Sequence, residues 1–204
     1  SNFCYTRSGS LISFTDVASL LMHNIYISKC HSNNYAVFHM KFTSLGKVHV
    51  SVKNCHFLSS SSQKTGGVLQ MEISQHDFLQ EDSNLGSTDD TLQQKNKLDL
   101  HFLVKNSTFE NCLSKTSGGA LAAIFKSDKS SKKYQRRKRS IWIEITKSLF
   151  LFNKASLNGG AIMTLNINTV LINSCKFSNN EAENSGGALY IVNTQLITVM
   201  NSTF

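Results

Sequence analysis

The chain has 204 residues, of which 40% are hydrophobic and 17% charged, a composition that supports a packed core and excludes a disordered chain. Its net charge of +8 at pH 7 lies almost entirely in residues 126–139, where eight Lys or Arg accompany one Asp and leave +1 for the rest. Because the remaining chain is nearly neutral, we expect no nucleic-acid partner. No apolar run reaches about 18 residues, so we expect no membrane span within the chain.

Short runs of alternating apolar residues recur along the chain, and each run precedes a Phe or a residue in its place. The first run precedes Ile27 and the others precede Phe57, Phe109, Phe150, Phe177 and Phe204. The runs are Ala18, Leu20 and Met22; Val48, Val50 and Val52; Leu100, Phe102 and Val104; Ile141, Ile143 and Ile145; Val170 and Ile172; Ile197 and Val199. Alternation with period two predicts β-strands.

A pair of glycines follows the Phe nine residues later in four copies of the pattern. These pairs are Gly66-Gly67, Gly118-Gly119, Gly159-Gly160 and Gly186-Gly187, while the first copy has Ala36-Val37 instead. The alternation of apolar residues falls out of phase before the Phe, which predicts a corner followed by a second short strand that carries the Phe. A third strand is expected to begin after the glycines. Each repeat therefore predicts three short strands and three corners in about 27 residues.

Stacking such repeats supplies the hydrogen bonds that a single repeat lacks. We predict an all-β fold, a right-handed parallel β-helix (solenoid), because parallel crossovers are almost always right-handed. A β-propeller and a β-sandwich are the competing interpretations, but propeller blades usually need about 40 residues. Residues 1–204 would form one domain of about six to seven rungs. The chain starts within the pattern and ends at a repeat boundary, so we expect a piece of a longer protein with flanking repeats or domains.

Two segments resemble the paired FxxN and GGA(I/L) repeats of the polymorphic outer membrane proteins, within the pectin-lyase-like group of right-handed parallel β-helices. They are Phe150-Leu151-Phe152-Asn153 with Gly159-Gly160-Ala161-Ile162, and Phe177-Ser178-Asn179-Asn180 with Gly186-Gly187-Ala188-Leu189. The resemblance covers most of residues 18–204 and is strict in these two copies; Ser60 and Cys112 replace the Asn earlier. It implies a surface-exposed β-helical passenger domain associated with adhesion.

The repeated residues have a structural explanation. Equivalent Phe side chains should stack from rung to rung as an aromatic ladder. Asn153 and Asn180 can satisfy backbone groups at a corner, and Gly-Gly permits positive φ or a close backbone approach. A repeated ligand groove is the alternative, but we expect scaffold positions.

Two repeats carry insertions at the same corner, between the strand after Gly-Gly and the next repeat. Residues 74–97 are acidic, with a net charge of −3, and residues 126–140 hold the basic segment. Insertions in solenoids often collect on a binding edge. We hypothesise that the two loops contact each other electrostatically; two independent, solvated loops are the alternative.

The basic loop ends in a multibasic run, Arg136-Arg137-Lys138-Arg139, followed by Ser140. It resembles a furin-type processing site, and a cut there would fall outside the strands. A polyanion-binding tip, a nuclear localisation signal and a solvated loop are the alternatives.

The five cysteines form no CxxC pair, so we expect no zinc site, no other metal and no cofactor. A disulfide between adjacent rungs is conceivable as Cys30–Cys55 or Cys55–Cys112, while Cys175 has no obvious neighbour. Buried free thiols are the alternative. The sequons at Asn106 and Asn201 indicate possible N-glycosylation and, with the cysteines and the multibasic run, favour an extracellular or cell-surface setting.

The acidic and imidazole side chains do not form a recognisable catalytic pattern. Asp89-Asp90 lies in an insertion, and Glu181 and Glu183 share one variable turn. Histidines are scattered, at positions 31, 39, 49, 56 and 101. We therefore expect no enzyme, but a non-catalytic extracellular or cell-surface recognition scaffold that binds a protein or glycan. A carbohydrate-active β-helix with absent or diverged active rungs is the alternative, and a pure spacer is a third.

Overall fold

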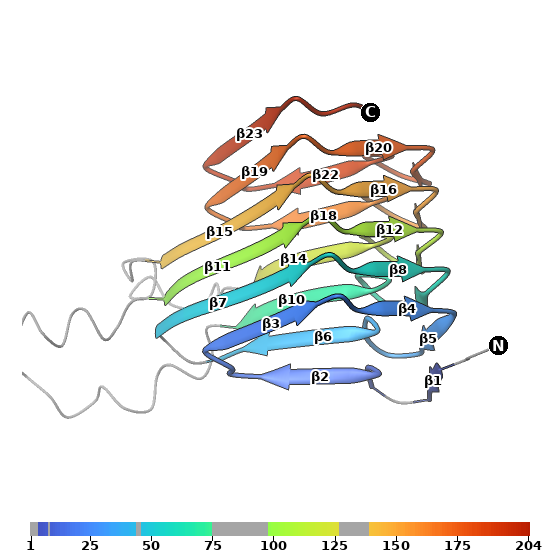
Figure 1. Cartoon of the computed structure of the whole chain (residues 1–204), viewed down its shortest axis with the longest axis horizontal. Helices are drawn as coiled ribbons and strands as arrows, with labels where there is room; N and C mark the ends of the chain where they lie inside the picture. Colours follow the sequence, from blue (N-terminus) through green and yellow to red (C-terminus); the bar gives the residue numbers. More distant parts are fainter. Residues whose placement is uncertain (1–3, 8, 44–45, 75–97, 127–138) are drawn as a thin grey trace, which may run out of the picture.

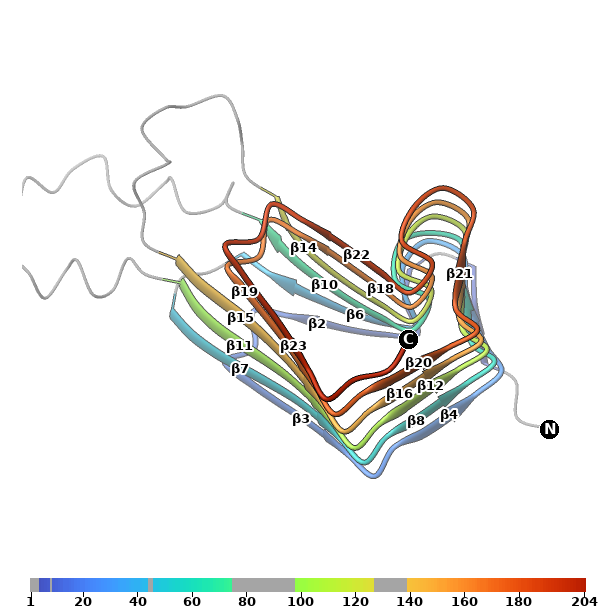
Figure 2. The same cartoon turned by 90° about the horizontal axis from the view of Figure 1, so that it is seen from above.

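The computed structural model describes residues 4–7, 9–43, 46–74, 98–126 and 139–204, and these residues form 23 β-strands and no helix. The strands stack into four parallel sheets, which we call A to D, that follow one another around a coil (Figure 1). Seen with the C-terminal end nearest the viewer, the chain turns counter-clockwise as it rises (Figure 2), so the coil is right-handed.

Sheets C and D form the first half of each rung. Sheet C contains β3 (Ser19–His23), β7 (Gly46–Lys53), β11 (Leu98–Lys105), β15 (Arg139–Thr146), β19 (Thr169–Asn173) and β23 (Leu196–Met200). Sheet D contains β4 (Tyr26–Ser28), β8 (His56–Leu58), β12 (Thr108–Glu110), β16 (Leu149–Leu151) and β20 (Lys176–Ser178).

Sheets A and B complete the rung. Sheet A contains β1 (Cys4–Thr6), β5 (Cys30–Ser32), β9 (Ser61–Ser62), β13 (Leu113–Ser114), β17 (Lys154–Ala155) and β21 (Glu181–Ala182). Sheet B contains β2 (Ile12–Thr15), β6 (Phe38–Phe42), β10 (Leu69–Ser74), β14 (Leu121–Lys126), β18 (Ile162–Leu165) and β22 (Leu189–Val192).

The predicted right-handed parallel β-helix is confirmed. The three strands expected in each repeat lie in sheets C, D and B, and the alternating runs are in register, as Val50, Phe102 and Ile143 show. The polar turn before Gly-Gly adds the very short strands of sheet A, which sequence alternation does not reveal.

The interior is filled by ladders of equivalent side chains. Val50, Phe102 and Ile143 are completely buried in sheet C. The aromatic ladder runs along sheet D and ends on Phe204, beyond the last strand of that sheet; it stacks Phe57, Phe109, Phe150, Phe177 and Phe204, each ring centroid 4.9 Å from the next. Each stacked pair contributes about 0.5–1.5 kcal/mol beyond the burial of its area.

The glycine pairs are required for two different reasons. The first glycine of each pair has a positive φ, such as +69° at Gly118. The second lies against the neighbouring rung, because a Cβ at Gly119 would collide with the carbonyl oxygen of Gly160. The pair therefore sets both the turn and the close stacking of rungs.

Both insertions leave and re-enter the coil at neighbouring strands. Ser74, the last residue of β10, pairs with Lys126, the last residue of β14. Leu98 and Arg139, which begin β11 and β15, also pair. The insertions are thus attached at the same corner, between sheets B and C, but the contact that we hypothesise between them lies outside the described residues.

Candidate binding face on sheet C

The outward positions of sheet C bring three ring-bearing side chains into one row along the coil. His49 pairs with His101 and His101 with Trp142 in the registers of β7, β11 and β15. The ring centroids lie 5.2 Å apart for His49 and His101, and 5.8 Å apart for His101 and Trp142. Trp142 remains 45% exposed, so a large aromatic surface faces solvent from a rigid strand.

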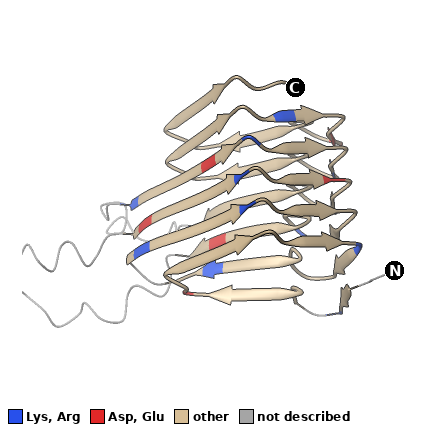
Figure 3. Cartoon of the chain, viewed as in Figure 1, with Lys and Arg blue, Asp and Glu red and all other residues tan. Residues whose placement is uncertain are grey.

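Charged groups of both signs flank this row. Lys47 and Asp99 pair with each other one outward position, or two residues, before the His rings. Glu144 lies one outward position, or two residues, after Trp142. Figure 3 shows residues of both signs on the front of this sheet, with signs that change from rung to rung at the starts of β7, β11 and β15 and positive residues at the ends of β7 and β11. The opposing charges leave the face without a strong net charge.

A hydrogen bond of 3.2 Å joins His101 Nε2 to Glu144 Oε2. Both side chains keep access to solvent, with exposed fractions of 37% and 28%. A shallow depression of about 300 Å³ lies beside them, lined by Ala18, Lys47, Val48, His49, Asp99 and His101. The bond therefore orients Glu144 next to His101, which lines the depression, without burying either side chain.

A second outward row of sheet C is largely apolar. Leu21, Ser51, Leu103, Glu144 and Leu171 are paired in succession across five rungs. Leu21 is strongly exposed, whereas Leu103 and Leu171 are half-buried. We use the name sheet C face for Lys47, His49, Asp99, His101, Trp142 and Glu144, with these leucines beside them. It combines apolar area with a few oriented polar groups, as ligand sites do.

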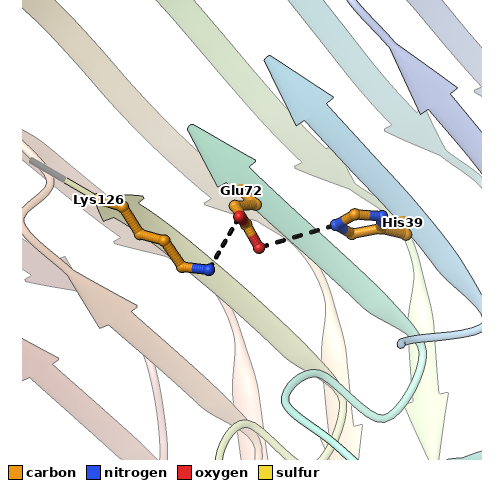
Figure 4. A network of polar contacts seen from close by, with 3 residues as sticks. All are labelled: His39, Glu72 and Lys126. Atoms are coloured by element: carbon orange, nitrogen blue, oxygen red, sulfur yellow. Dashed lines mark ion pairs between the residues drawn. The ribbon is translucent and has the colours of Figure 1, made fainter. Parts of the chain in front are cut away.

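The outer side of sheet B carries a different polar network (Figure 4). Glu72 Oε1 forms an ion pair with Lys126 Nζ at 2.8 Å, and Glu72 Oε2 lies 3.9 Å from His39 Nε2. Tyr35 stacks on His39 with a centroid separation of 4.4 Å. Burial lowers the pKa of His39, and this effect outweighs the opposite effect of Glu72. His39 and Glu72 are mostly covered, so this network is a structural tie rather than an open site.

A third cluster lies on the outside of sheet A. His31 contacts Ser61 Oγ through Nδ1 at 2.7 Å and Asn33 Oδ1 through Nε2 at 3.0 Å, and Tyr5 stacks on its ring. This resembles the order of nucleophile, base and orienting group in a hydrolase. However, nearby backbone N–H groups, such as that of Gln63 to Ser32, donate to the neighbouring rung and do not form an oxyanion hole.

The structure corrects our description of the histidines as scattered. His49 and His101 are 52 positions apart in the sequence but adjacent in the sheet. Sequence reasoning also missed Lys47, Asp99, Trp142 and Glu144. The sequence contained the information needed to find these residues. Aligning the alternating runs on their apolar residues places the intervening outward residues of neighbouring strands side by side.

Asp99 and Glu144, the two carboxylates of the sheet C face, do not form a pair suited to glycoside hydrolysis. Asp99 is paired with Ser140, four residues before Glu144, so the two carboxylates are separated by about 13 Å along the strand. Hydrolases of this type need a separation of about 5–9.5 Å. Glu181 bonds Lys154 at 3.1 Å, and Asp89-Asp90 lies outside the described residues. Glu144 and His101 remain the one carboxylate and base in contact on this face.

The two disulfide pairings considered from the sequence do not form. Cys30 is bonded to Cys4, its register partner in the neighbouring rung, while Cys55, Cys112 and Cys175 are free and buried. A bridge needs the same ladder position in adjacent rungs. Cys30 and Cys55 occupy different positions, as do Cys55 and Cys112, and Ser60 stands between Cys30 and Cys112 in their shared ladder.

The bond after Arg139 lies inside a strand, which corrects our expectation that a cut would fall outside the strands. Arg139 and Ser140 begin β15 and pair with Leu98 and Asp99. The Arg139 guanidinium also lies 4.1 Å from the ring centroid of Phe125. Residues 136–138 lie outside the described residues. Cleavage after Arg139 would require the start of β15 to detach.

The two sequon asparagines, Asn106 and Asn201, are exposed at equivalent corners with φ of 47° and 48°. Among the described residues, no three His, Cys, Asp or Glu side chains gather as metal ligands. That part of the chain also contains no helix that could cross a membrane.

One family match agrees with the geometry of the repeat. Residues 174–192 match the Chlamydia polymorphic membrane protein repeat. This segment contains the corner at Cys175, the stacked Phe177 and the Gly186-Gly187 turn, so the match covers one copy of the unit that builds the coil. The predicted resemblance to polymorphic membrane protein repeats is confirmed for this copy. No curated protein and no solved structure matches the chain.

Proposed function

We propose that this β-helix is a non-catalytic extracellular or cell-surface recognition domain, and that its ligand binds the sheet C face. The single observation that carries the proposal is the exposed row of His49, His101 and Trp142 on three rigid rungs. Trp is enriched among residues that dominate binding energy, and a parallel sheet fixes its position.

Three further observations support a surface location. The polymorphic membrane protein repeat at residues 174–192 is named for membrane proteins. The Cys4–Cys30 disulfide is typical of an oxidising compartment. Exposed Asn106 and Asn201 are accessible for glycosylation where the host carries out that modification.

A carbohydrate-active enzyme is the second candidate, favoured by the contact between His101 and Glu144. The separation of Asp99 and Glu144 opposes it, because the second carboxylate that such chemistry needs is too distant. We therefore place recognition before catalysis.

The test is a binding screen of the purified chain against arrays of extracellular proteins and glycans. We expect at least one ligand whose binding is lost in Trp142→Ala and retained in Tyr26→Ala, since Tyr26 is an exposed aromatic residue on sheet D. Digestion of intact source cells with an added protease should also remove the domain. Absence of any ligand on both arrays, or protection of the domain in intact cells, would overturn the proposal.

A further inference from the structure

We infer that the sheet C face binds an uncharged, linear oligosaccharide whose chain lies along the coil axis. This inference rests on the proposed function and names the chemical class of its ligand. It begins from the direction of the row: His49, His101 and Trp142 lie on three successive rungs, which are spaced by about 4.8 Å. A ligand that contacts all three must be extended and must cross the strands.

The chemistry of the row fits a sugar ring. A pyranose has an apolar face of C–H groups and an equatorial rim of hydroxyls. The indole of Trp142 offers an exposed apolar surface against which such a face can stack, and Leu103 adds half-buried apolar area next to it. The tilted rings of His49 and His101 continue this surface along the row.

The polar groups lie where they can bind hydroxyls. Asp99 and Glu144 are acceptors, and Lys47 is a donor at the rim of the depression. The bond from His101 to Glu144 holds that carboxylate in place before a ligand arrives. Such an arrangement reduces the entropy that binding must overcome.

The charges next to the aromatic row disfavour an anionic ligand. Asp99 and Glu144 flank the rings and would repel sulfated or uronate-rich chains placed on them. Lys47 provides partial compensation, and Lys53 and Lys105 lie four residues further along β7 and β11 than the His rings. Arg139 begins β15 at the end of sheet C, where its guanidinium lies against the ring of Phe125 rather than beside the aromatic row. A neutral glycan avoids the repulsion and can still use all three charged groups as hydrogen-bond partners.

The test uses the fact that Trp142 is the only Trp of the chain, so its fluorescence reports on this face alone. Uncharged tetrasaccharides (cellotetraose, chitotetraose, laminaritetraose and maltotetraose) are titrated into the whole chain, with tetragalacturonate and a heparin tetrasaccharide as anionic probes. We expect saturable fluorescence change with at least one neutral probe, with Kd below about 1 mM, and none with the anionic probes.

Calorimetry then compares variants with that probe. Trp142→Ala should weaken binding by about tenfold or more, and Glu144→Gln should weaken it without changing the thermal unfolding midpoint. Tyr26→Ala is the matched aromatic control on sheet D and should bind as the wild type does.

Three results would overturn the inference: no saturable change with any neutral probe, binding of the anionic probes only, or equal affinity of Trp142→Ala and the wild type. A protein ligand from the array that still requires Trp142 would preserve the proposed function and reject the saccharide. Loss of both would reject the proposed function as well.

Discussion

Asn180 accepts two hydrogen bonds from Asn153 of the preceding rung, one from its backbone N–H and one from its side-chain Nδ2, each 3.0 Å long. Asn153 in turn accepts the backbone N–H of Cys112 and donates to the carbonyl of Phe109. The repeated Asn therefore satisfies buried backbone groups of the neighbouring rung, which a regular parallel ladder leaves open at a corner.

Replacing Asn153 by Ala should destabilise the chain by about 2–4 kcal/mol, because the Cys112 N–H and the Phe109 carbonyl lose their partners in a buried corner. Denaturant unfolding would measure the change. Asn184→Ala is the matched control, since Asn184 is exposed, its side chain donates to Asn158 Oδ1, and its backbone bond to the Leu157 carbonyl is retained in Ala; its effect should stay within about 0.5 kcal/mol. Equal effects of the two substitutions would contradict the role of the corner amide.

The second glycine of the pair provides a separate test of rung stacking. Gly119→Ala would place a methyl group against the carbonyl oxygens of Gly160 and Lys154, so we expect a loss of about 2–3 kcal/mol or failure to fold. Gly9→Ala tests positive φ alone, because φ is +110° there and no atom lies within 4 Å of the added carbon. It should cost about 1 kcal/mol. A smaller loss at Gly119 than at Gly9 in thermal unfolding would refute the stacking explanation.

The fold was predictable because three features repeat with fixed spacing. Alternation gave the strands of sheets C and B, the Phe marked sheet D, and the glycines marked the corner before sheet B. Sheet A was not predictable, since most of its strands, such as Ser61–Ser62, have only two residues and cannot show alternation. Their pairing comes from the stacking of the whole rung.

The candidate site was harder to predict than the fold, because it depends on register across the insertions. His101 and Trp142 are 41 positions apart, and the second insertion lies between them. Only the structure shows that they share a row. The Cys4–Cys30 bridge was missed for a related reason. The first rung lacks the repeated Phe and glycines, so Cys4 could not be aligned with a position of the later repeats.

The thiols should be nearly inert in the native protein. Burial raises the pKa of Cys112 to about 12 and also raises the pKa of Cys55 and Cys175. Because only the thiolate reacts, we expect no alkylation of these three residues at pH 7.5 in native buffer. In denaturant without reductant, mass spectrometry should detect labels on all three, and with reductant also on Cys4 and Cys30. Native labelling of Cys112, or labelling of Cys30 without reductant, would contradict the observed burial or pairing.

The network on sheet B predicts how stability depends on pH. Burial lowers the pKa of His39; Glu72 raises it, while Lys126 and Lys41 lower it further. The unfolded chain therefore binds this proton more readily than the folded chain. The stability contributed by neutral His39 is fully present above the pKa of His39 in the unfolded chain. It is lost as pH falls from that pKa to the lower pKa of His39 in the folded chain.

The test replaces His39 by Gln and measures the free energy of unfolding from pH 8 to pH 5. The wild type should lose stability as pH falls below about 6.5, and His39→Gln should show a flatter profile because the residue no longer binds a proton. Lys126→Met should also flatten the profile, since removing a nearby cation allows the His39 pKa to rise toward its usual value while Glu72 still attracts the proton. A profile of His39→Gln that is parallel to that of the wild type throughout would show that His39 does not carry this dependence.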